Sequence, residues 1–238
     1  MMINPLGTLA IATSLLTTGL SSPAPAASTF AELCAALQDY RPLPELDGAA
    51  AWDTMDALLA AVATEDCAAA EARLAMVTDL HPPSLTTTPT EAGLAIDLPI
   101  MVDLQIIAIA APALTRLDLN GSVVSELDAI AELSNLQELH LANTQLTDLT
   151  PLVSLARLKF LDVSHNQIAS IAPLADIPTL RSLNLAFNPV TDLSPLGEIY
   201  TVRADEEPWR LLDLRGLDYD LRTCPGVLGD VCEGDIYE

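Results

Sequence analysis

Residues 136–157 read LQELHLANTQLTDLTPLVSLAR, and this stretch decides the fold. Its pattern recurs every 22 residues, in copies that begin at Leu114, Leu136, Leu158 and Leu180. Seven or more aliphatic positions stay in phase across the copies, which neither chance nor a single amphipathic helix produces. One copy cannot bury its apolar side alone, so the pattern indicates units that stack around a shared aliphatic interior.

Each copy contains two leucines two residues apart, such as Leu139 and Leu141. Residues at this spacing point to the same side of a strand, so each copy is expected to form one short strand. The prolines at Pro151, Pro173 and Pro195 lack a backbone donor and suit the start of a 3₁₀ or irregular turn on the return side.

The pattern L-x-x-L-x-L-x-x-N-x-L resembles the leucine-rich-repeat family, and Thr147–Leu152 resembles the 22-residue class of bacterial internalin-type proteins. The resemblance implies an α/β solenoid with a parallel sheet on its concave face. It also implies a structural ladder, in which buried polar side chains satisfy backbone groups of adjacent coils. The ladder positions are Ser122, Thr144, Asn166 and Asn188.

The repeats, assigned to 114–200, are flanked by other segments. Residues 28–80 are expected to form a helical amino-terminal cap, because Phe30, Leu33, Cys34 and Leu37 follow a helical spacing. Residues 81–113 are interpreted as a proline-rich linker and a degenerate repeat, with Leu94–Leu98 alternating like a strand. Residues 201–238 are expected to form a carboxy-terminal cap.

Residues 1–27 are typical of an export signal, because the apolar stretch Leu6–Leu20 is followed by the small-residue pattern Ala24-x-Ala26. The alternative is an uncleaved membrane anchor, although the 15-residue stretch is shorter than the roughly 20 residues of a spanning helix. An export signal predicts a secreted or periplasmic protein without membrane insertion after cleavage.

Four cysteines in an exported chain favour disulfides, and three pairings are possible. The pairs Cys34–Cys67 and Cys224–Cys232 are expected, one at each end of the array. The spacing lacks the C-x2-C of zinc sites, so no metal is predicted.

The composition excludes several classes of function. With 33 acidic and 10 basic residues, the formal net charge is −23, which opposes binding to nucleic acid and to anionic lipid surfaces. The sequence lacks the G-x-S-x-G, H-E-x-x-H, P-loop and G-x-G-x-x-G motifs. It therefore predicts neither an enzyme nor a cofactor, and the strong acidity favours a soluble monomer.

The family resemblance places a binding surface on the outward side chains of the strands. The candidate residues are Arg116, Asp118, Glu138, His140, Phe160, Asp162, His165, Asn184 and Phe187. Phe160 and Phe187 are the expected anchors, unless flanking segments cover them. Asp118 and Asp162 flank His140, so they are expected to raise its pKa. The alternatives are a metal site and an ordinary solvated polar row.

The leading hypothesis is a non-enzymatic module that binds a protein partner. The first alternative is a structural or envelope-associated protein without a specific ligand. The second is a hydrolase or metal-dependent enzyme that uses the row around His140.

Overall fold

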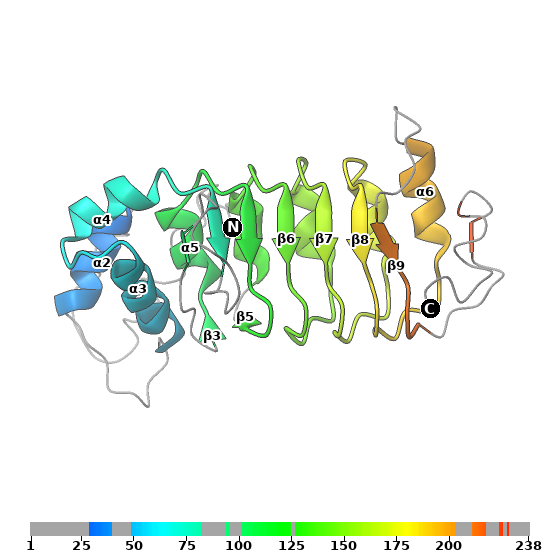
Figure 1. Ribbon diagram of the computed structural model, residues 1–238, viewed down its shortest axis with the longest axis horizontal. Coiled ribbons are helices and arrows are strands. Elements are labelled where there is room, and N and C mark those ends of the chain that lie inside the picture. The colour runs from blue at the N-terminus through cyan, green and yellow to red at the C-terminus, as the bar shows by residue number, and fades with distance from the viewer. Residues whose placement is uncertain are drawn as a thin grey trace, which may run out of the picture.

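The computed structural model describes residues 29–39, 49–81, 94–95, 101–124, 127–202, 211–217, 224–225 and 228. Within these ranges, parallel strands stand side by side along the long axis of the molecule (Figure 1). The larger sheet has the order β2-β1-β4-β6-β7-β8-β9, and the smaller sheet pairs β3 with β5. The strands are β1 Asp79–His81, β2 Leu94–Ala95, β3 Met101–Val102, β4 Arg116–Asp118, β5 Val123–Val124, β6 Glu138–His140, β7 Phe160–Asp162, β8 Ser182–Asn184 and β9 Leu211–Asp213.

The register follows the 22-residue period. Leu117, Leu139, Leu161 and Leu183 pair in turn across β4, β6, β7 and β8, and all four are completely buried. A slip of one residue in any pairing would expose these leucines and bury the polar residues beside them. The predicted solenoid with a parallel sheet is confirmed.

The return side of the coils carries short helices behind the sheet (Figure 1): η2 Leu127–Glu132, η3 Thr150–Ser154 and η4 Ala172–Asp176. Pro151 and Pro173 lie in the first turns of η3 and η4, as the sequence predicts. Pro195 instead lies in an α-helix, α6 Ser194–Val202, which packs against η4. The last coil has room for this longer helix because Leu183 pairs with Leu212, 29 residues further on.

Buried amide side chains join the coils. Asn166 Oδ1 accepts hydrogen bonds from the backbone N–H groups of Thr144 and Leu146, at 3.0 Å each. Its Nδ2 donates to the carbonyls of Leu141 and Val163, at 2.7 and 2.9 Å. Asn188 repeats part of this pattern one coil later. Buried backbone groups that would otherwise be unpaired are therefore satisfied between coils.

The first coil begins earlier than the sequence indicates. Leu80 in β1 pairs with Leu117, so residues 79–81 form a strand of the sheet rather than the end of the predicted helical cap, 28–80. The coil continues through α5 Leu104–Ala110, and β2 pairs with the outer side of β1. The 37 residues that separate Leu80 from Leu117 hide this strand from a search at a period of 22.

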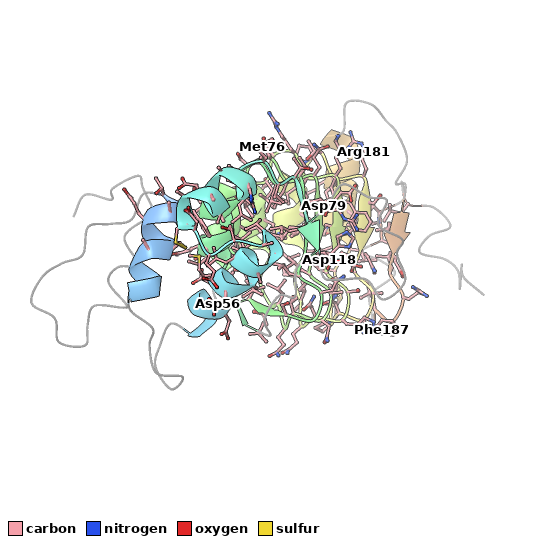
Figure 2. The ribbon with its side chains drawn as sticks, turned by 60° about the vertical axis from the view of Figure 1, so that its left-hand side comes forward. Asp56, Met76, Asp79, Asp118, Arg181 and Phe187 are labelled. Atoms are coloured by element: carbon pink, nitrogen blue, oxygen red, sulfur yellow. A yellow bond between two sulfur atoms is a disulfide. The ribbon has the colours of Figure 1, made fainter. Side chains whose placement is uncertain are left out.

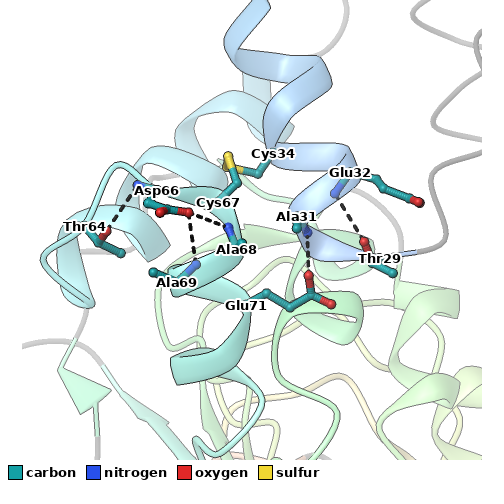
Figure 3. The surroundings of a disulfide bond; sticks show 10 residues. All are labelled: Thr29, Ala31, Glu32, Cys34, Thr64, Asp66, Cys67, Ala68, Ala69 and Glu71. Carbon is teal, nitrogen blue, oxygen red and sulfur yellow. Dashed lines mark hydrogen bonds between the residues drawn. A yellow bond between two sulfur atoms is a disulfide. The ribbon is translucent and has the colours of Figure 1, made fainter.

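Three helices lie at the amino-terminal end: α2 Phe30–Asp39, α3 Ala49–Ala61 and α4 Cys67–Leu74. The predicted disulfide Cys34–Cys67 joins α2 to α4 (Figure 3). The Asp66 carboxylate caps α4 by accepting hydrogen bonds from the N–H groups of Ala68 and Ala69. Because α2 and α3 both pack against α5, these helices contact the end of the repeat core.

At the carboxy-terminal end, β9 adds a strand within the range predicted to be a cap. Leu212 and Leu214 are buried, as expected for residues that close the core. Trp209, Cys232 and the predicted signal segment lie outside the described residues. Cys224 is disulfide-bonded, and its pairing with Cys232 stays a prediction. Among the described helices, none combines the length and hydrophobicity needed to cross a bilayer.

Replacing Asn166 with Ala tests the ladder. The change leaves two N–H donors and several carbonyls unpaired in the interior, so we expect the free energy of unfolding to fall by about 3 kcal/mol or more. Urea denaturation measures this loss. The matched control Gln167→Ala, at an exposed position one residue on, is expected to stay within about 0.5 kcal/mol of the parent. Equal effects of both changes would contradict a structural role for Asn166.

Replacing both Cys34 and Cys67 with Ala tests the disulfide. The bridge closes a loop of 33 residues, so its loss should cost about 3–4 kcal/mol. Because the bridge joins only α2 and α4, we expect faster amide hydrogen exchange there and unchanged exchange in β6, β7 and β8. Faster exchange throughout the sheet, with no preference for these helices, would show that the bridge supports the whole array.

Candidate functional site: the open face of the sheet

Side chains on both sides of each buried leucine point away from the core, because successive residues of a strand face opposite sides. We call this surface the open face. It comprises Arg116, Asp118, Glu138, His140, Phe160, Asp162, Ser182 and Asn184. Ser182 is buried, Glu138 is exposed, and the others are partly exposed.

Charged side chains meet at the first strands of the open face. The Arg116 guanidinium lies 3.8 Å from the Asp79 carboxylate on β1 and 3.6 Å from the Glu138 carboxylate on β6. Asp79 and Asp118 both appear on this side of the sheet in Figure 2. Arg116 is thus flanked by carboxylates, and the surface stays acidic around it.

His140 lies beside Phe160 on the next strand, with 4.7 Å between the ring centroids. Burial lowers the pKa of His140 below its usual value, although Asp118 and Asp162 act in the opposite direction. The expectation of a raised pKa is therefore wrong. The charges beside the imidazole are present as predicted, but removal of the ring from water outweighs them.

A second row of residues follows the strands at the turn. Gly121, Asn143, His165, Phe187 and Gly216 all have positive φ, between 55° and 77°. The first four donate their backbone N–H groups to carbonyls of the next coil, which requires this conformation in each turn. We call this row the rim. It brings His165 and Phe187 together as a stacked pair, with ring centroids 4.5 Å apart.

The Phe187 ring is held from both sides. His165 stacks on one side, and a Cβ atom at Gly216 would lie 2.6 Å from the ring, so only glycine leaves room there. The ring nevertheless remains 51% exposed. Figure 2 shows Phe187 at the edge of the molecule opposite Arg181.

Asp79, Asp213 and Gly216 are site residues that the sequence interpretation missed. Asp79 was placed in the helical cap, and the other two were placed in the carboxy-terminal cap. A signal was available, because Leu212-Asp213-Leu214-Arg215-Gly216 repeats the pattern of Leu117-Asp118-Leu119-Asn120-Gly121. No group of three or more potential metal ligands comes together within the described ranges, and this finding includes the row around His140.

The fold and this surface define a parallel β-solenoid with an open sheet face. Residues 112–154 and 156–198 match the family described as Leucine Rich repeats (2 copies). The chain is therefore a leucine-rich-repeat protein, and such domains generally mediate interactions between proteins.

Similar solved structures include two internalins of Listeria monocytogenes and a leucine-rich-repeat protein of Leptospira interrogans. Internalin C2 is 27% identical, covers 53% of this chain and 51% of its own, and has a TM-score of 0.45. The second internalin is 25% identical, with coverages of 67% and 46% and a TM-score of 0.48. The Leptospira protein is 20% identical, with coverages of 50% and 29% and a TM-score of 0.42. The chain thus spans about half the length of these internalins.

The internalin-type class to which these two structures belong is also the class that the repeat resembles in sequence. A comparison with curated protein sequences gives no significant match.

The direction of the His140 shift predicts how stability depends on pH. The unfolded chain binds a proton at His140 near pH 6.5, whereas the folded chain resists it. The unfolded state therefore holds more protons between the folded pKa and about 6.5, so this group lowers stability as the pH falls through that interval.

Proton NMR of the His140 ring should show an inflection below 6.5, and His140→Asn should lose this part of the pH dependence of the urea midpoint. An inflection above 6.5 would contradict the effect of burial.

Proposed function

We propose that this protein is a non-enzymatic module that binds a protein partner through the open face and the rim, with Phe187 as the principal anchor. The observation that carries the proposal is the exposed yet immobilised ring of Phe187. An aromatic anchor that is already held in place loses little side-chain entropy on binding. Phe160 is the second aromatic of this surface, beside His140.

Phe187 carries two energetic costs that a purely structural residue would avoid. Its ring is half exposed to water, and its φ of 58° is unfavourable for a bulky side chain, at about 1–3 kcal/mol. Glycine and asparagine fill equivalent rim positions at Gly121 and Asn143, so the turn itself does not require phenylalanine. Costs of this kind are characteristic of residues that have a role outside folding.

We further propose that the protein works outside the cytoplasm. The disulfide Cys34–Cys67 supports this location, because such bonds persist in oxidising compartments. The predicted export signal points to the same conclusion.

A photo-crosslinking amino acid at position 187 tests the proposed function. Incubated with the native extracellular fraction, this protein should give a discrete adduct that excess unlabelled protein competes away. The same amino acid at position 176, which is exposed on η4 behind the sheet, should not. A competitor with Phe187→Asn should compete at least about tenfold more weakly, while its thermal midpoint should equal or exceed that of the parent, because Asn143 adopts the same backbone conformation.

Equal adducts from positions 187 and 176, or full competition by the Phe187→Asn protein, would contradict this binding surface. A protein with only a structural role would give neither the adduct nor the difference between competitors.

A further inference from the structure

One position in each strand has a structural duty that explains its residue type. This is the residue directly after the buried leucine: Asp118, Asp162, Asn184 and Asp213. In each case Oδ1 accepts a hydrogen bond from the backbone N–H two residues later, at 2.9–3.1 Å. Aspartate and asparagine are the residues that form this local turn.

His140 occupies the same position in β6 without this duty. The N–H of Ala142, two residues later, instead donates to Asn120 Oδ1 of the preceding coil, at 2.7 Å. A side chain from another coil thus replaces the local cap. The imidazole is therefore not needed to close its own turn.

The surroundings of His140 are suited to a ligand. Its Nε2 atom is buried and has no hydrogen-bond partner within the described part of the chain. The Phe160 ring lies 4.7 Å away. A buried nitrogen without a partner costs about 1–3 kcal/mol, which a donor or acceptor from a ligand would recover.

The charge around this pair selects the ligand. Arg116 and Asp118 face His140 from β4, Glu138 lies on β6 itself, and Asp162 lies on β7. The three carboxylates outnumber the single guanidinium, which Asp79 and Glu138 already flank. An anionic group would be repelled, whereas a cation would be attracted to the carboxylates and to the face of the Phe160 ring.

We propose that His140 and Phe160 receive a lysine or arginine side chain of the protein partner. This inference rests on the proposed function and names the chemistry that the open face recognises. The cation donates a hydrogen bond to His140 Nε2, lies against the Phe160 ring, and is balanced by Asp118, Glu138 and Asp162.

The same geometry makes recognition depend on pH. Burial lowers the pKa of His140, so the imidazole is neutral at neutral pH and its nitrogen can accept a hydrogen bond. Protonation in acid removes the acceptor and adds a positive charge that repels the cation. Binding should therefore weaken from about pH 7.5 to about pH 5, before the carboxylates are largely neutralised.

The test uses five-residue peptides, Gly-Gly-X-Gly-Gly with both ends blocked, where X is lysine, arginine, norleucine or glutamate. Each is titrated into the isotope-labelled full chain at physiological ionic strength, and NMR follows the His140 and Phe160 rings. Lysine or arginine should shift both rings, whereas norleucine and glutamate should not. Norleucine is the critical comparison, because it keeps the length of lysine without the charge.

Three variants accompany the titration. His140→Asn should fold normally, because Asn184 fills the equivalent position, and Phe160→Leu keeps an apolar residue. Both should weaken binding at least about fivefold. Asp176→Asn removes one carboxylate behind the sheet and should leave binding unchanged, which separates local recognition from general attraction to an acidic protein. Thermal midpoints verify folding.

The inference is overturned if no peptide shifts the rings at millimolar concentration, if norleucine acts as strongly as lysine, or if Asp176→Asn weakens binding as much as His140→Asn. If the peptides fail while position 187 still gives its specific adduct, only the cationic ligand is wrong. If the peptides bind at His140 but position 187 gives no specific adduct, the inference stands and the proposed anchor fails.

Discussion

The in-register stacking of Leu117, Leu139, Leu161 and Leu183 is the constraint on which the rest of the structure depends. Each leucine is completely buried, so the strands cannot slide by one residue without exchanging their apolar and polar faces. The polar neighbours of these leucines therefore form ordered columns on the open face. The binding surface is a consequence of how the core is packed.

Two recurrent backbone devices hold this stack at its turns. An aspartate or asparagine after the buried leucine caps the strand end, and a left-handed residue then passes the chain to the next coil. Most coils use the residue types that physical chemistry favours at these positions. His140 departs from the first device and Phe187 from the second, and both form ring contacts on the exposed side. Departures from a repeated structural rule are where function is expected.

The sequence predicted the part of the fold that repeats exactly in length. The period of 22 residues located β4, β6, β7 and β8, because each leucine has an equivalent one period away. It missed β1 and β9, because coils of 37 and 29 residues interrupt the period. The candidate residues were largely visible, but the pKa of His140 was not, since charges can be read from a sequence whereas burial cannot. The support of Phe187 by Gly216 was hidden for the same reason as β9.

The most direct test of the account is the detection by NMR of scalar couplings across the hydrogen bonds between coils. The account predicts couplings from the amide nitrogens of Leu119, Leu141, Val163 and Leu185 to the carbonyl carbons of His140, Asp162, Asn184 and Asp213, respectively. Couplings to residues shifted by one position, or protected amides coupled to other strands, would contradict the register and with it the open face and its proposed role.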